Sequence, residues 1–362
     1  MQLKTDRRAL HQIPELDRDL PETLAYLKSS LAPLNCRVFS PAETGLCAWF
    51  DFGRAEALAF RADCDGLPIC EQTGAAYASF HPGAMHACGH DGHMAILLEL
   101  ARRLSEKKTY PRNVLLVFQS AEETTGGARD ICESGVFEQY NVRAIFGLHL
   151  WPGLEAGVMA SRCRELMARS CEVTVDIFGK SAHIARAEAG IDALAAGVKF
   201  YTEAMTMEQV LPKKFFRLLK FGKFESGTVR NALAAQAHLE GSLRAFQDEV
   251  FEGLQEGLRS IRDRVCREFG CTMDLHFSSG YPAVMNPPEL YARVRQVMAF
   301  RELERPAMTA EDFSWYQRYL PGMFFFLGVG DTPALHGDTF DFDEGVLEKG
   351  ADFFEELGEK LP

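Results

Sequence analysis

Long apolar segments and export signals are missing from this sequence. No run of about 18 consecutive apolar residues occurs, so the pattern excludes an ordinary membrane-spanning helix. The first eight residues, from Met1 to Arg8, contain no apolar stretch of the kind that a signal peptide requires. We therefore expect a cytoplasmic protein with no membrane partner.

Basic residues are scarce relative to acidic ones. The 362 residues include 39 Lys+Arg and 51 Asp+Glu, which gives a formal net charge of −12. That balance disfavours duplex nucleic acid as a partner. The ten cysteines include no CxxC pair, and most are expected to be small buried apolar residues. A GxSxG elbow is also absent, which argues against a serine hydrolase.

The chain is long enough for two domains. Its first half alternates short apolar runs with stretches of helical periodicity, the pattern of an α/β fold with a largely parallel sheet. We expect strands at 46–52, 57–61, 114–118 and 144–148, and helices at 92–104 and 124–136.

The pattern changes after about residue 165. The predicted order is strand 171–178, helix 191–210, strands 215–224 and 232–243, helix 248–269 with Asp248 as its cap, and strand 272–277. This β-α-β-β-α-β order is typical of a ferredoxin-like unit. A helix at 288–300, a strand at 324–329 and a helix from Phe342 follow. We therefore predict one domain made of 1–167 and 282–362, interrupted by a second at 168–281.

The densest cluster of chemically reactive side chains is His86-Ala87-Cys88-Gly89-His90-Asp91-Gly92-His93. Thiolate and imidazole are preferred ligands of Zn²⁺ and related ions. Cys88 and His90 could turn toward one ion in an extended segment, and Asp91 would then cap a helix that begins near Gly92. The alternative is a histidine-rich loop that binds no metal.

A second cluster, Gln119-Ser120-Ala121-Glu122-Glu123, follows the predicted strand 114–118. Active sites of α/β proteins lie at this end of the strands. One carboxylate could bind metal while its neighbour moves a proton. The alternative is a helix N-terminus that simply favours acidic residues.

Other candidate residues also follow predicted strands. Asp63 and Asp65 come after strand 57–61, His149 after strand 144–148, and His336 in a loop after strand 324–329. If they converge, the ligands are Cys88, His90, Glu123, His149 and His336. Five ligands are too many for one tetrahedral ion and suit two ions that share a bridge.

These motifs resemble the amidohydrolase branch of the co-catalytic metallopeptidases, which includes hippurate hydrolase, N-acetyldiaminopimelate deacetylase, auxin-conjugate hydrolase and aminoacylase. The resemblance extends over nearly the whole chain, through the segments 10–16, 61–68, 85–91, 118–123, 147–152 and 311–314. It implies a zinc-peptidase-like α/β/α catalytic domain with an inserted α+β ferredoxin-like lid and dimerisation domain.

The resemblance also implies roles for individual residues of the catalytic domain. Cys88 matches a bridging thiolate, and the other four ligands named above match the remaining metal ligands. Glu122 matches the general base. Asp65 matches an acidic residue that orients a metal ligand, with nearby Asp63 as the alternative. Two divalent cations are implied, Zn²⁺ or Mn²⁺, with Co²⁺ or Ni²⁺ as alternatives.

In the inserted domain, His183, Asn231 and Arg244 match substrate-binding positions, and the insert is implied to form a homodimer. Glu188 stands where family members usually have a second histidine. The implied reaction is hydrolysis of the amide bond of N-acyl amino acids of the acetyl or benzoyl type. Alternatives are a dipeptidase or carboxypeptidase with the same metal centre, and a non-catalytic metabolite-binding protein.

Overall fold

The computed structural model describes residues 2–42 and 45–361. The chain divides into two compact units. Unit 1 comprises Met1–Leu166, Met285–Pro306 and Asp312–Pro362, and unit 2 comprises Met167–Val284 and Ala307–Glu311. The α/β core is therefore discontinuous in sequence, and the second unit is built mainly from one long insertion.

Unit 1 contains an eight-stranded mixed sheet in the order β1-β2-β4-β3-β5-β14-β6-β13. Its strands are β1 (Arg37–Phe39), β2 (Leu46–Phe50), β3 (Ala57–Asp63), β4 (Asn113–Gln119), β5 (Val142–Pro152), β6 (Met159–Ser161), β13 (Arg301–Glu302) and β14 (Gly322–Gly330). The four central strands, β4, β3, β5 and β14, are parallel to one another. Parallel strands of this kind are covered on both faces, which explains their almost continuous apolar sequences.

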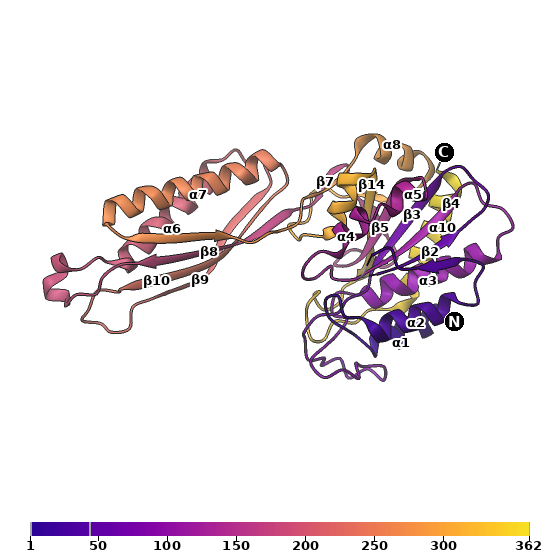
Figure 1. Ribbon diagram of the computed structural model, residues 1–362, viewed down its shortest axis with the longest axis horizontal. Helices are drawn as coiled ribbons and strands as arrows, with labels where there is room; N and C mark the ends of the chain where they lie inside the picture. The colour runs from indigo at the N-terminus through magenta and orange to yellow at the C-terminus, as the bar shows by residue number, and fades with distance from the viewer. Residues whose placement is uncertain (1, 43–44, 362) are drawn as a thin grey trace. The chain divides into compact units, whose positions relative to one another are not determined.

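Helices cover both faces of this sheet. One layer packs against alternate strand residues such as Phe60, Phe118 and Phe146, all of them buried. It contains α1 (Gln2–His11), α2 (Pro21–Leu31), α3 (His90–Glu106), α8 (Pro288–Val297) and α10 (Leu347–Lys360), and Figure 1 shows α1, α2 and α3 stacked together. The short helices α4 (Gly127–Glu133), α5 (Val136–Gln139), α9 (Tyr316–Tyr319), η2 (Asp312–Trp315) and η3 (Glu344–Val346) complete unit 1.

Unit 2 is an antiparallel four-stranded sheet with two helices on one face (Figure 1). Its elements follow the chain as β8 (Arg169–Phe178), η1 (Ile184–Ala189), α6 (Ala193–Val210), β9 (Arg217–Ser226), β10 (Gln236–Ala245), α7 (Asp248–Phe269) and β11 (Thr272–Phe277). The strand order β11-β8-β10-β9 is that of a ferredoxin-like β-α-β-β-α-β unit. A separate two-stranded sheet joins β7 (Arg164–Met167) and β12 (Val284–Asn286).

Two predictions about helix caps were wrong. Helix α3 begins at His90 after Gly89, so Asp91 lies in its first turn and accepts a hydrogen bond from the Gly92 backbone instead of capping the helix. The residue before α7 is Gln247, and Asp248 lies inside the helix, where its carboxylate pairs with Arg169.

The single helix predicted at 124–136 is instead two short helices, α4 and α5. Gly126 and Gly135 both adopt positive φ angles, of 81° and 75°, and each precedes a new helix. Glycine enters this left-handed region at little cost, so these residues break the helical pattern. The result is a loop between β4 and α4 that carries the paired glutamates.

Among helices within residues 2–42 and 45–361, none combines the length and the apolar character that a bilayer crossing requires.

Candidate metal centre

Four of the five predicted ligands lie at or just beyond the carboxyl ends of central strands or at the start of α3. β4 leads into Glu123, β5 contains His149 near its end, and Cys88 lies two residues before His90, the first residue of α3. His336 comes from the loop after β14, and its backbone N–H donates to the carbonyl of Ala87 at 2.9 Å. Parallel strands end at one edge of the sheet, so residues far apart in sequence meet there.

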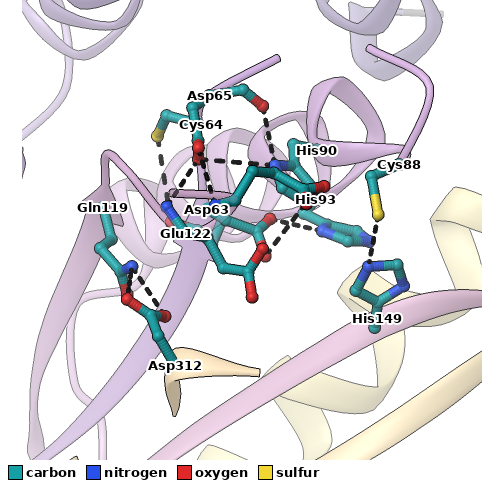
Figure 2. Close-up of polar contacts among 12 residues, drawn as sticks. Asp63, Cys64, Asp65, Cys88, His90, His93, Gln119, Glu122, His149 and Asp312 are labelled. Atoms are coloured by element: carbon teal, nitrogen blue, oxygen red, sulfur yellow. Dashed lines mark hydrogen bonds and ion pairs between the residues drawn. The ribbon is translucent and has the colours of Figure 1, made fainter. Parts of the chain in front are cut away.

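Cys88 lies at the centre of the cluster. Its Sγ is 3.3 Å from Nε2 of His149 and 3.3 Å from Nε2 of His336. Figure 2 shows the sulfur directed at the His149 ring. Two groups of closely spaced ligand atoms share this cysteine: Cys88 with His90 and His149, and Cys88 with Glu123 and His336. Each group has its atoms within 4.8 Å of one another, close enough that either group could hold a cation.

In both His90 and His149, Nδ1 donates a hydrogen bond to a backbone carbonyl, which leaves Nε2 of the neutral ring with a lone pair. His90 donates from Nδ1 to the backbone carbonyl of Asp65 at 2.8 Å, and His149 donates from Nδ1 to the carbonyl of Leu150 at 2.7 Å. The Nε2 atom of His90 is buried without a hydrogen bond, as is Oε1 of Glu123. Oε1 of Glu123 lies 3.3 Å from Nε2 of His336 as an ion-pair contact, and a cation among these atoms would satisfy the buried nitrogen of His90.

Charges in the cluster also fit a cation. Burial raises the pKa of the Cys88 thiol well above its usual value, and the carboxylates of Glu123 and Glu122 raise it further. Burial alone would lower the pKa of His90, but Asp63, Asp65 and Glu123 together raise it to about 10. The surrounding carboxylates therefore favour a positive charge here, which a proton or a metal ion can supply. With its proton removed, the Cys88 sulfur between the two imidazoles could bind a metal ion.

Asp65 fixes the position of both glutamates. Its two carboxylate oxygens accept the backbone N–H groups of Glu122 and Glu123, each at 3.0 Å, while its own carbonyl holds His90. Asp63 faces different partners, with its carboxylate 2.5 Å from Nδ1 of His93 and 2.7 Å from Nη1 of Arg61. The two aspartates predicted as alternatives thus occupy separate hydrogen-bond networks.

The loop that carries the glutamates is tightly constrained. Ala121 has a positive φ of 59°, an uncommon conformation for a residue with a side chain, and strain of this kind concentrates at functional sites. At Gly127 a Cβ atom would lie 2.1 Å from the carbonyl oxygen of Ser120, so only glycine fits. Glu122 is 7% exposed and lies within 4.8 Å of the ligand atoms of His90 and Glu123, within reach of a reaction at the cluster.

The three predicted substrate-binding residues lie in unit 2, at two places. His183 is exposed and precedes η1, and the N–H of Ile184 donates to the carbonyl of Asn231, so His183 and Asn231 are neighbours. Arg244 lies near the end of β10, where its guanidinium donates to the carbonyl of Met308 at 2.6 Å. In the antiparallel ladder between β10 and β8, Arg244 lies opposite Ser170, near the start of β8. Asn231 belongs to the loop that precedes β10. These two positions are at opposite ends of the unit 2 sheet.

Sequence reasoning missed a buried network beside the cluster. Arg61 bonds to Asp63, Gln119 and Asp312, and Figure 2 shows Gln119 and Asp312 together. Burial raises the pKa of Asp312 to about 6, although Arg61 and Gln119 act to lower it. Arg61 and Asp312 lie in the segments 61–68 and 311–314, but the sequence assigns no partner to either side chain. Only the fold shows that Arg61 of β3, Gln119 of β4 and Asp312 of η2 meet.

Comparisons with known proteins agree with this geometry. The model of peptidase family M20/M25/M40 matches residues 59–360. An uncharacterized hydrolase of Staphylococcus haemolyticus is 34% identical, with 97% of this chain and 96% of that protein covered.

Two solved structures are also similar. One, from methicillin-resistant Staphylococcus aureus and described provisionally as an aminohydrolase, is 29% identical with a TM-score of 0.92, covering 98% of this chain and 95% of that one. A dinuclear metal-binding peptidase of the M20 family from Bacillus subtilis is 29% identical with a TM-score of 0.84, covering 99% and 96%. The chain belongs to peptidase family M20/M25/M40, and it is a metal-dependent hydrolase of the amidase and peptidase type.

Proposed function

We propose that this protein hydrolyses the amide bond of N-acyl amino acids of the acetyl or benzoyl type, releasing a carboxylic acid and a free amino acid. The observation that carries the proposal is the buried thiol of Cys88 shared by two groups of ligand atoms, with Glu122 beside them. A similar protein from Bacillus subtilis is described as a dinuclear metal-binding peptidase, which supports an amide as the bond that is cleaved.

Cys88, His90 and His149 would hold one divalent cation, and Cys88, Glu123 and His336 the other. Bound divalent cations supply Lewis acidity, which polarises an amide carbonyl and lowers the pKa of water. Glu122 would accept the proton of the attacking water and deliver it to the departing amine nitrogen. Asp65 holds the backbone of Glu122 through one carboxylate oxygen, and this fixes where that base can act.

Residues of unit 2 would recognise the substrate. Arg244 would pair with the free carboxylate of the amino acid, since a guanidinium matches a carboxylate with two parallel hydrogen bonds. His183 would donate to the oxygen that gains negative charge as the carbonyl is attacked, with Asn231 beside it. Arg244 lies eight residues after the first residue of β10, so about 26 Å of strand separates it from the end where Asn231 and His183 lie.

That separation supports a homodimer. One unit 2 cannot bring both ends of its sheet to one small substrate, so we assign His183 and Asn231 to the site of a partner subunit. The surface for pairing would be β9, an edge strand, together with the exposed stripe Leu194, Val198 and Tyr201 on α6. These residues are spaced at i, i+4 and i+7 and therefore lie on one face of the helix. Unpaired edges and apolar stripes are common association surfaces.

The substrate proposal is tested with a panel of acetyl-, benzoyl- and dipeptide substrates, each assayed with Zn²⁺, Mn²⁺, Co²⁺ and Ni²⁺. We expect N-acyl amino acids to be cleaved with the highest kcat/KM, and chelation to abolish the activity. Preferential cleavage of unblocked dipeptides would instead assign the dipeptidase alternative. No hydrolysis of any substrate by metal-loaded protein would favour the metabolite-binding alternative.

The dimer is tested separately by light scattering. Replacing Val198 and Tyr201 together by Glu should give a monomer, because charges would face each other across a two-fold interface. Val210→Glu provides the matched control, since Val210 is 74% exposed on the same helix but faces another direction. A wild-type protein that is already monomeric at micromolar concentration would contradict the dimer.

A further inference from the structure

The third histidine of the motif, His93, has no role in the proposed reaction. It lies one turn after His90 on α3 and is 2% exposed. Figure 2 places it between Asp63 and the ligands of the cluster. Its ring centre is 4.6 Å from that of His149, and the two planes are inclined by 69°. A buried histidine in this place requires a partner for each ring nitrogen.

The contacts of His93 determine its tautomer. The backbone N–H of Leu150 donates to Nε2 of His93 at 2.9 Å. Since a backbone N–H can only donate, Nε2 must carry the lone pair, and the ring proton lies on Nδ1. Nδ1 therefore donates to the carboxylate of Asp63, 2.5 Å away. Asp63 thus selects the form of His93 that can accept from Leu150.

Leu150 is held from both sides. Its N–H is bound by His93, and its carbonyl accepts from Nδ1 of His149 at 2.7 Å. The ladder between β3 and β5 ends at the pair Arg61 and Gly147. Beyond that pair, His93 provides the hydrogen bond that a neighbouring strand would otherwise supply. The position of the Leu150 carbonyl determines which nitrogen of His149 is protonated and where Nε2 points.

Asp63 is anchored in turn. Arg61 donates to it from Nη1 at 2.7 Å and to Asp312 from Nη2 at 2.9 Å, and all three side chains are fully buried. The guanidinium compensates the negative charge that Asp63 would otherwise bury alone. The connection from Arg61 through Asp63, His93 and Leu150 to His149 is therefore continuous and shielded from water.

We propose that Asp63 and His93 are positioning residues that fix the tautomer and the direction of His149 through the backbone of Leu150. The inference rests on the proposed function in one respect, that His149 binds a cation through Nε2. Groups behind a metal ligand commonly change metal affinity by about 10- to 100-fold when they are removed.

Two substitutions of His93 separate positioning from packing. The amide of His93→Asn reaches the place of Nδ1 and can still bond Asp63, but it leaves the Leu150 N–H without an acceptor. The longer His93→Gln places its oxygen near the former Nε2 and restores that acceptor. We expect about a 10- to 100-fold weaker Co²⁺ affinity for His93→Asn and recovery to within about fivefold of wild type for His93→Gln.

Co²⁺ affinity is measured by competition with a chromogenic chelator, together with the thermal midpoint of the metal-free protein. His238→Asn provides the matched control, because His238 also donates from a ring nitrogen to an aspartate, Asp176 at 2.7 Å, in unit 2. It should leave Co²⁺ affinity within twofold. A merely structural role for His93 would lower the thermal midpoint of both His93 variants alike without this order of affinities.

A second measurement needs no variant. Nitrogen-15 spectra of the histidines in metal-free wild-type protein should show His93 and His149 both protonated on Nδ1. Finding His149 protonated on Nε2, or Co²⁺ affinity of His93→Asn within twofold of wild type, would overturn the inference and leave the metal site in place. Wild-type protein that binds no Co²⁺ would overturn the proposed function as well, which distinguishes the two failures.

Discussion

The ligand cluster of unit 1 and the His183–Asn231 segment of unit 2 are built in contrasting ways. Cys88, His90 and His149 are at most 7% exposed, and the two histidines are each held from behind by a backbone carbonyl. His183 is exposed, and its Nδ1 accepts a hydrogen bond from the backbone N–H of Ala185 at 3.2 Å. The first group is therefore held in place by buried contacts, whereas the side chain of His183 is open to solvent.

The difference between the two groups matches what each is proposed to bind, a cation in unit 1 and a substrate in unit 2. Cation binding needs ligand atoms fixed to within fractions of an ångström, and buried hydrogen bonds provide this. Recognition of a substrate that must enter and leave benefits from groups that move. Changes in unit 1 should therefore alter chemistry and metal binding, and changes in unit 2 should alter turnover without affecting the metal.

The largest expected effect is that of Glu122→Gln. The amide keeps the shape of Glu122 but cannot accept a proton, so turnover should fall by about 10²–10⁴-fold. Co²⁺ affinity should stay within severalfold of wild type. Glu123→Gln is the matched comparison, because losing a ligand should weaken Co²⁺ binding instead. Near wild-type turnover in Glu122→Gln would remove this residue as the base.

His183→Ala should have the next largest effect. Loss of a hydrogen-bond donor to the developing oxyanion should lower kcat by about 10²–10³-fold, with unchanged metal content. The proposed dimer makes a sharper prediction, since mixing His183→Ala with Glu122→Gln under subunit exchange should restore activity at one of the two mixed sites. If confirmed exchange restores no activity, His183 does not act on a partner's site.

The smallest expected effect concerns the pH dependence of stability at Asp312. Its folded pKa of about 6 lies above the usual value for aspartate of about 3.9. The neutral carboxyl therefore contributes stability below about pH 4, and this contribution is lost as the pH rises through 6. Between pH 4 and 7 the loss is at most about 3 kcal/mol.

Asp312→Asn mimics the neutral carboxyl at every pH, so it should gain stability relative to wild type as the pH rises from 4 to 7. Denaturant unfolding of metal-free protein at both pH values measures this difference. A relative stability that is independent of pH, or that moves in the opposite direction, would show that Asp312 is ionised throughout this range.

Much of this architecture could be predicted from the sequence, for local reasons. Apolar runs such as 114–118 identify buried strands, and the concentration of ligand types from His86 to His93 indicates a metal site. Helix boundaries that depend on the backbone conformation of a glycine were harder to predict, as the separate helices that begin after Gly126 and Gly135 show. Strands of two or three residues, such as β6 and β13, are too short to carry a periodic signal.

The role of His93 could not be predicted, because its two partners are brought to it only by the fold. Asp63 is 30 residues away and Leu150 is 57 residues away. The spacing of three residues between His90 and His93 does place both on one helical face, and that signal was available. What it could not show is that His93 bonds a strand backbone instead of a cation.

The most direct test of the account measures how many divalent ions each chain holds and whether Cys88 joins them. Elemental analysis of Co²⁺-loaded wild-type protein should give two ions per chain, and Cys88→Ala should retain fewer than one under the same dialysis. Cys47→Ala, which alters a buried cysteine on β2, should retain two. One ion or none in the wild type, or two tightly held ions in Cys88→Ala, would contradict a centre bridged by this sulfur.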